Sequence, residues 1–427
     1  MKRALRLLLT FCILALALPT VGCGSQGLFA PTPEPVTLRV AFRDGTVDLQ
    51  ELADSYHEDN PNVTIELVTA QRYGNQIRDH IRSGNVDIFR AGLEGLEYID
   101  GGYIVPFDDI QLQDWTKIKD DYYEGVWEGL QVSGQQWGVP AGIDTFVTYA
   151  NVNQALALEV ALPEGQWDMF QFLDLANAMN YPEGLPYNDS GYLWGFCSDP
   201  TTYSFDPVIL AYLYGGRIVD DLGSPTVATL DDPLTIEATQ WYSDLANRYM
   251  VMPQSQEVKR RFSRGGVFEA QIRGGCALWL GMYSNRGGLD SPYKWTVEWK
   301  MLPLPTANEP MTLGLVEGYF VTKDCENRQE ALKFLRYLSD RWESSGQFMP
   351  PRLSQIQSDA YQEAVGEDVA TVFSDSPTEL VILPGGLSPV LEKVGEVYLR
   401  SVIEIVTQDL DAGMVLEEAQ DTLRGAY

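Results

Sequence analysis

The sequence contains very little histidine, little cysteine and few positive charges. Among 427 residues there are 2 histidines and 5 cysteines, and 30 lysines and arginines stand against 60 aspartates and glutamates, a formal net charge of −30. A surface this negative repels nucleic acid and anionic lipid headgroups, so we expect no nucleic-acid partner. The charge favours a soluble chain and a neutral or cationic ligand.

The sequence also lacks the short motifs that mark common catalytic sites. It has no HExxH zinc motif, no GxSxG nucleophile turn and no Walker A loop. Both histidines, His57 and His80, fall in predicted helices, where we expect them to face solvent. Paired carboxylates of the kind that glycoside hydrolases use occur by chance in a chain with 60 acids. These absences disfavour an enzyme, and we expect no metal or cofactor.

Only three cysteines lie beyond the first 23 residues. Cys197, Cys276 and Cys325 are an odd number at wide spacing, which is neither a disulfide framework nor a zinc site. A Cys197–Cys276 disulfide can form outside the cytoplasm. Buried free thiols are the alternative.

The N-terminus has the pattern of a secretory signal peptide. Lys2, Arg3 and Arg6 precede an apolar run of twelve residues at 7–18. That run is shorter than the roughly 20 apolar residues that span a bilayer. A basic start and a short apolar run are typical of a signal peptide, which we place at residues 1–22. No later stretch is long and apolar enough to span a membrane.

The end of this segment resembles a bacterial lipobox. Thr20-Val21-Gly22-Cys23 places small residues before a cysteine, with threonine where leucine is usual. The resemblance implies that Cys23 is lipidated and becomes the new N-terminus. An ordinary secretory signal with an incidental cysteine is the alternative. Residues 23–36 contain several Gly, Ser and Pro residues, which predicts a flexible linker after the lipid anchor.

Strand and helix patterns alternate in the remaining chain, which predicts α/β layers. The length left after signal cleavage favours two or more domains. Asp168 followed by Gln171, and Asn327 followed by Glu330, predict the capped starts of two helices. Other predicted elements are strands at residues 37–42, 63–68 and 86–89, and helices around residues 49–56 and 77–81.

Several segments resemble, in family order, the family 1 extracellular solute-binding proteins, which include maltose-binding protein. Each motif is weak alone, but together they extend over residues 37–352. The segments are YHEDNPNVTIELV (56–68), SGNVDIF (83–89), WGVPAGIDTFVTYAN (137–151), WDMFQFLDLANAM (167–179), ILAYLYGGRIVDD (209–221), CALWLGMYSN (276–285) and the run from WKMLPLP to FLRYLSD (299–340).

The resemblance implies an α/β fold with two lobes, a periplasmic-binding-protein-like clamp with discontinuous lobes and a multi-crossing hinge. Lobe 1 is expected at residues 37–140 and 303–341, and lobe 2 at residues 141–302 and 342–427. Crossings are expected near residues 139–141, 302–305 and 341–344. Pro140, Pro303 and Pro305 could confine bending there, since proline fixes φ. The alternative is that these prolines only end strands.

The same resemblance implies a set of ligand-binding residues, because sugars need planar polar groups and flat aromatic rings. Alternatives remain open: Asp44 as a turn residue, Arg90 and Glu94 as an ion pair with each other, Tyr283 in the core, and Arg352 in an ion pair that closes the lobes. The implied set is Asp44, Arg90, Glu94, Asp144, Tyr283, Glu317, Tyr319 and Arg352.

Other aromatic residues are expected to serve the core rather than the ligand, among them Trp127, Trp137 and Trp194. The sequence departs from maltodextrin-binding relatives at VILPGGLSPV (381–390), where those relatives carry a further tryptophan. That departure disfavours a maltodextrin-type oligosaccharide and favours a smaller or different solute.

The implied function is a substrate-binding lipoprotein of an ABC importer, which captures a carbohydrate outside the cytoplasm and delivers it to the permease. The expected partners are the small-molecule solute, the transmembrane subunits of the permease and, through Cys23, the membrane. The chain is expected to be a monomer. Two alternatives are a receptor that presents its ligand to a membrane sensor and a glycan-active enzyme.

Overall fold

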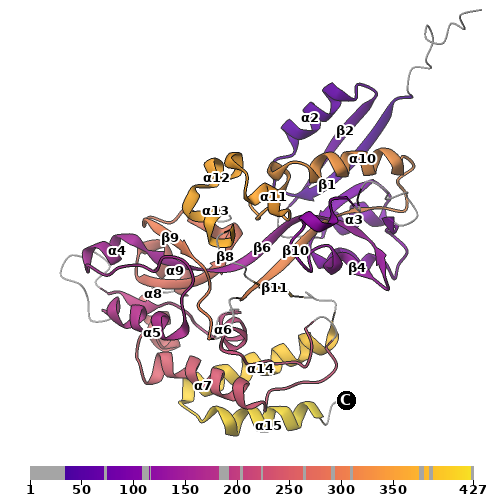
Figure 1. Cartoon of the computed structure of the whole chain (residues 1–427). Helices are drawn as coiled ribbons and strands as arrows, with labels where there is room; N and C mark the ends of the chain where they lie inside the picture. The colour runs from indigo at the N-terminus through magenta and orange to yellow at the C-terminus, as the bar shows by residue number, and fades with distance from the viewer. Residues whose placement is uncertain are drawn as a thin grey trace, which may run out of the picture. The chain divides into compact units, whose positions relative to one another are not determined.

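A mixed β-sheet runs through the folded part of the chain (Figure 1). Nine strands of the described residues follow the order β2-β1-β3-β10-β6-β8-β7, with β11 beside β10 and β9 beside β6. The strands are β1 (Val36–Arg43), β2 (Val63–Ala70), β3 (Ile88–Ala91), β6 (Gly138–Asn151), β7 (Trp194–Phe196), β8 (Cys276–Met282), β9 (Trp299–Leu302), β10 (Met311–Val321) and β11 (Glu379–Ile382). A separate hairpin pairs β4 (Gln131–Val132) with β5 (Gln135–Gln136).

The helices of this computed structural model complete the predicted α/β architecture. They are α2 (Gln50–Asp59), α3 (Gln76–Arg82), α4 (Val152–Ala157), α5 (Met169–Ala178), α6 (Asp206–Tyr214), α7 (Pro233–Asn247), α8 (Ser255–Phe262), α9 (Gly266–Arg273), α10 (Arg328–Ser339), α11 (Leu353–Ile356), α12 (Asp359–Val365), α13 (Glu367–Ser374), α14 (Pro389–Gln408) and α15 (Ala412–Arg424). Short 3₁₀ helices are η1 (Leu93–Tyr98), η3 (Lys119–Asp121), η4 (Glu128–Leu130), η5 (Tyr283–Gly288) and η6 (Trp342–Ser345).

The structure describes residues 34–71, 75–107, 115, 117–181, 192–201, 205–222, 225–262, 266–289, 294–307, 311–374, 379–383 and 388–424. The predicted signal peptide and Cys23 lie outside these residues, as do most of the predicted linker and part of the 381–390 segment. Contacts group Thr37–Tyr427 as one unit, distinct from Met1–Val36. Within the described ranges, every helix is too short or too polar to cross a membrane.

Two long antiparallel strands, β6 and β10, are shared by the two ends of the sheet. Near Gly138, β6 pairs with Phe320 of β10, which pairs in turn with β3. Further along, β6 pairs with β8 and β9. All fourteen residues of β6 are buried. We call β1–β3 with α2, α3 and α10 the first half, and β7–β9 with α4–α9, α14 and α15 the second half.

Apolar packing differs between the ends of these shared strands. Phe320 of β10 stacks on Phe89 of β3 with ring centroids 5.2 Å apart, in the first half. Leu313 of the same strand packs with Phe146 in the large core of the second half, which also includes residues of α5, α6, α7, α14 and α15. One strand therefore contributes to packing in both halves.

Most predicted elements are confirmed, with small shifts. The strands expected at 37–42 and 63–68 are β1 and β2, whereas the strand expected at 86–89 begins at Ile88. Pro140 lies inside β6, opposite Gly318, so it does not end a strand. Pro303 does follow the last residue of β9. Trp127 and Trp194 are buried, as expected, and Trp137 is half-buried.

The two predicted helix caps have different outcomes. Asp168 accepts hydrogen bonds from the backbone N–H groups of Phe170 and Gln171, and the Gln171 side chain accepts one from the Asp168 N–H. This capping box is confirmed. α10 also starts where expected, but the Asn327 side chain makes no capping hydrogen bond. The predicted Asn327 cap is therefore wrong. Glu330, expected to complete it, accepts a 2.7 Å hydrogen bond from the Tyr56 hydroxyl instead.

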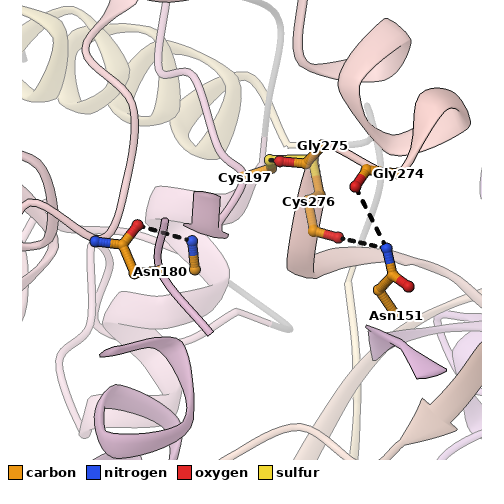
Figure 2. Close-up of a disulfide and its surroundings, with 7 residues drawn as sticks. Asn151, Asn180, Cys197, Gly274, Gly275 and Cys276 are labelled. Carbon is orange, nitrogen blue, oxygen red and sulfur yellow. Dashed lines mark hydrogen bonds between the residues drawn. A yellow bond between two sulfur atoms is a disulfide. The ribbon is translucent and has the colours of Figure 1, made fainter. Parts of the chain in front are cut away.

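A disulfide joins Cys197 to Cys276, the first residue of β8 (Figure 2). Beside it, the Asn151 side chain donates to the carbonyl oxygen of Cys276 at 3.2 Å. The third cysteine, Cys325, is free and buried, and burial raises the pKa of its thiol to about 11. The sequence left either a disulfide or free thiols open for Cys197 and Cys276, and the structure contains the disulfide.

Candidate functional site

Three of the residues implied by the resemblance meet where β3 and β10 pair. Arg90 and Tyr319 are directly opposite in the antiparallel ladder, so their side chains lie on the same face. The Arg90 Nε donates to the Glu317 carboxylate at 2.6 Å, and the guanidinium carbon lies 5.7 Å from the centre of the Tyr319 ring. Arg90 is only 2% exposed. Its side chain therefore serves contacts within the protein.

The charge state of this cluster follows from its burial and its partners. Burial is the largest single influence and acts to lower the pKa of Arg90, but Glu317 and Tyr319 together outweigh it and the net shift is upward. Burial also raises the pKa of Tyr319, while the adjacent Arg90 opposes that shift. The arginine remains charged, and its charge is balanced locally by Glu317.

Glu94 does not pair with Arg90, so the ion pair considered from the sequence is wrong. Glu94, in η1, instead binds Arg43 at the end of β1, with 2.8 Å between Oε1 and Nη2. β1 and β3 are parallel neighbours, and their carboxyl ends meet at one edge of the sheet, where open α/β sheets bind ligands. Asp44 is exposed in the turn after β1, at the same edge.

Asp144 lies in the middle of β6 and is 8% exposed. Its carboxylate accepts hydrogen bonds from the Ser284 backbone N–H at 2.9 Å and from the Ser284 hydroxyl at 2.6 Å. Asp144 pairs with Leu315, two residues before Glu317 on β10, so these side chains share a face. Leu315 is 37% exposed on this central strand. That face of the sheet is thus open to solvent beside Asp144.

Tyr283 has no exposed surface. Its hydroxyl contacts the hydroxyl of Tyr361 in α12, and the Arg286 guanidinium carbon lies 4.4 Å from the ring centre. The ring also packs edge-to-face with Phe373 at 6.1 Å. Burial raises the pKa of Tyr283, and Arg286 opposes this shift. In this conformation the contacts favour the core-packing interpretation over a ring that faces a solute.

Arg352 lies apart from the other implied residues. It donates to Asp121 from Nε and to Asp340 from Nη1, both at 2.7 Å. Asp121 also accepts from the backbone N–H and the hydroxyl of Ser354. Burial raises the pKa of Asp121, but the bonds from Ser354 and Arg352 outweigh burial and lower it overall. The structure therefore places Arg352 in an ion-pair network.

Four residues near the site were missed by the sequence reasoning: Arg43, Ser284, Arg286 and Gln347. Ser284 directly follows Tyr283, so the CALWLGMYSN resemblance reached its neighbour without selecting it. Gln347 donates from its backbone N–H to the Thr46 carbonyl and accepts from Arg286. These residues lie far from Gln347 in the sequence, so no local pattern indicates the contacts. In the described part of the chain, no cluster of three or more His, Cys, Asp or Glu residues could hold a metal ion.

A comparison with protein families shows which family the chain belongs to. The profile of the bacterial extracellular solute-binding protein family matches residues 43–341, which is most of the chain. The chain therefore belongs to this family. Its place of action is outside the cytoplasm, where a disulfide such as Cys197–Cys276 is stable.

Solved structures with the same fold are similar at low sequence identity. The ABC substrate-binding protein of Listeria monocytogenes in complex with cycloalternan has a TM-score of 0.70 and 15% identity, over 92% of this chain and 99% of that chain. The maltose-binding protein MalE of the same organism, in complex with maltose, has a TM-score of 0.69 and 15% identity, over 92% of this chain and 99% of that chain. UgpB of Mycobacterium tuberculosis, in complex with glycerophosphocholine, has a TM-score of 0.66 and 14% identity, over 92% of this chain and 98% of that chain. The predicted two-lobe α/β fold class is confirmed.

Proposed function

We propose that this chain is the substrate-binding lipoprotein of an ABC importer and that it captures an uncharged carbohydrate. The observation that carries this proposal is that each arginine at the candidate site already binds acceptor groups of the protein. Arg90 is bonded to Glu317 and Arg43 to Glu94, and Arg286 donates to backbone carbonyls. At Arg90 or Arg43, an anionic solute would have to displace a carboxylate. Sugar hydroxyls can instead donate to carboxylate and carbonyl oxygens.

The known ligands of similar structures frame this choice. The two Listeria proteins were crystallised with sugars, and the Mycobacterium protein with glycerophosphocholine, which carries a phosphate. The fold thus serves both kinds of solute, and the charges at the site must distinguish them. The excess of acid over base in this chain supports the uncharged class.

We further propose a division of roles among the implied residues. Asp44, Glu94, Asp144 and Glu317 keep oxygen atoms toward the shared edge and the open face of the sheet, and they bind the solute. Tyr283, Tyr319 and Arg90 support the site from within the protein, whereas Arg352 stabilises a separate ion-pair network. The lobes remain as proposed from the sequence, with β6 and β10 as crossings between them. Permease subunits receive the solute from the closed form.

A neutral sugar should bind, and Asp144→Asn should weaken that binding at least tenfold. The amide keeps the size of the carboxylate and can keep both Ser284 contacts, but it removes the negative charge and replaces one acceptor oxygen by a donor, so a sugar hydroxyl that donates to that oxygen loses its acceptor. Native mass spectrometry of the purified protein identifies a retained solute. Calorimetry with maltose, mannobiose and glycerophosphocholine then tests the class. At 100 times Kd, a ligand stabilises the folded state by about 2.7 kcal/mol.

Asp121→Asn is a closely matched control for this experiment. Like Asp144, Asp121 accepts from a serine N–H at 2.9 Å and from the same serine's hydroxyl at 2.6 Å. Because it belongs to the separate Arg352 network, its substitution should leave affinity unchanged. Binding of glycerophosphocholine without any sugar would refute the carbohydrate class. Equal losses in the two variants would refute a direct role for Asp144.

Cys23→Ser should release the protein from the membrane fraction. One acyl chain gives only marginal membrane attachment, whereas two or more chains hold a protein stably, so loss of the modified cysteine should remove nearly all binding. The measurement is fractionation of cells that express the native chain or the variant. Cys325→Ser is the control, because this cysteine lies inside the folded part. A Cys23→Ser protein that stays with membranes would argue for another means of attachment.

A further inference from the structure

The segment of residues 344–349, which we call the bridging segment, contacts the loop that follows β1. The Gln347 N–H donates to the Thr46 carbonyl at 3.1 Å, and the Gln347 side-chain amide donates to the Gly45 carbonyl. Gly346 has φ +66°, and a Cβ at this position would lie 2.2 Å from the Thr46 carbonyl oxygen. The close approach therefore requires glycine, both for its backbone conformation and for space.

The same segment also contacts η5, which directly follows β8 of the second half, and β6 in the middle of the sheet. Arg286 of η5 donates from Nη1 to the Gln347 carbonyl at 2.6 Å. Met349 and Ile143 of β6 exchange two backbone hydrogen bonds, each 2.9 Å long. Gln347 thus joins the loop after β1 to η5, the helix that carries Tyr283 and Ser284.

Arg90 lies beneath this segment and holds it at three places. Its Nη1 donates to the Ser344 carbonyl at 2.9 Å and its Nη2 to the Ser345 carbonyl at 3.0 Å. Its guanidinium carbon lies 5.0 Å from the centre of the Phe348 ring. At Gly142, below, a Cβ would lie 2.8 Å from Phe348 Cβ and 3.2 Å from Arg90 Nη2. The packing leaves no room for a larger residue at that point of β6.

We propose that Arg90 is a positioning residue of the solute site. By fixing the Ser344 and Ser345 carbonyls, it holds the bridging segment against β6 and β10, so that Gln347 can join the loop after β1 to η5. The site on these two loops is then assembled before a solute arrives. Its description as a solute site rests on the proposed function, whereas the coupling of the loops is a property of the ligand-free chain.

Hydrogen exchange of the ligand-free full chain tests the proposal. Arg90→Lys keeps a positive charge for Glu317 but cannot donate to Glu317 and both serine carbonyls in the guanidinium geometry. We expect peptides that cover residues 343–350 and 283–288 to exchange at least tenfold faster in this variant. Peptides from α14, which packs in the core of the second half, should exchange at rates within twofold of those in the native chain.

Arg39→Lys is the matched control. Arg39 lies on neighbouring β1 and likewise makes three side-chain hydrogen bonds, two to the Asp87 carboxylate and one to the Gly84 carbonyl. It makes no described contact with the bridging segment, so exchange at 343–350 should not change. If Arg90→Lys leaves exchange at 343–350 unchanged, or raises exchange uniformly along the chain, Arg90 has no positioning role.

Gln347→Ala tests the second step without touching the buried arginine. It removes the side-chain bond to Gly45, so exchange should rise in the peptide that covers residues 43–50. Unchanged exchange there would refute the bridge. These results are separate from the proposed function, because no ligand is present. A chain that binds sugar but shows no coupling would keep the function and lose this inference, and a coupled chain that binds no sugar would do the reverse.

Discussion

Arg90→Met should lower the free energy of unfolding by about 3–5 kcal/mol, the usual cost of removing one partner of a buried ion pair. The substitution leaves Glu317 only partly exposed and without its cation, and it leaves the Ser344 and Ser345 carbonyls without the donor that Arg90 supplied. Methionine fills much of the space, so the loss reflects unsatisfied polar groups more than a cavity. Urea unfolding followed by circular dichroism measures the change.

Two further variants separate the charge from the packing. Arg43→Met breaks the Arg43–Glu94 pair, in which both side chains are partly exposed, and we expect a cost of about 1 kcal/mol or less. Arg90→Met combined with Glu317→Leu removes both charges, so it should recover part of the loss. If Arg90→Met is no more damaging than Arg43→Met, the Arg90 cluster does not stabilise the fold.

Loss of the disulfide should cost a similar amount. Cys197 and Cys276 are 79 residues apart. In the chain-entropy description, a crosslink over a loop of this length stabilises the folded state by about 4 kcal/mol, because it restricts the unfolded chain. The double variant Cys197→Ala with Cys276→Ala should therefore show a clearly lower urea midpoint than the native chain.

Cys325→Ala provides the control, since it also replaces a buried cysteine but breaks no crosslink. Its cost should be that of a small cavity, about 1 kcal/mol. A reducing agent present during unfolding should lower the midpoint of the native chain and of Cys325→Ala, but not that of the double variant. Equal midpoints for the native chain and the double variant would mean that the disulfide adds nothing to stability.

Local sequence patterns predicted the features whose causes are local. Asp168 and Gln171 cap α5 as expected because a capping box depends on residues three positions apart. Asn327 and Glu330 show the same spacing, but Tyr56 competes for Glu330 from 274 residues away. The two motifs are alike in the sequence, and a tertiary contact decides between them.

For the candidate site, the resemblance indicated some of the residues that lie together but not all of their contacts. The resemblance selected Arg90, Glu317 and Tyr319, and the structure brings these three together. It could not indicate that Arg90 also binds the Ser344 carbonyl, which lies 254 residues away, or that Glu94 takes Arg43 as its partner. Such contacts depend on strand order and on the path of the chain after α10, which residue patterns do not encode locally.

The shared strands β6 and β10 also limit how the two halves can move. From Phe320 opposite Gly138 to Gly314 opposite Thr145, the paired strands resist sliding, because a slip by one residue would turn each buried side chain to the opposite face. The ladder is interrupted between Glu317 and Gly318, where an extra residue of β6 forms a bulge and increases the local twist. Relative motion should therefore be a rotation about this point, which places the Arg90–Glu317 pair beside the pivot.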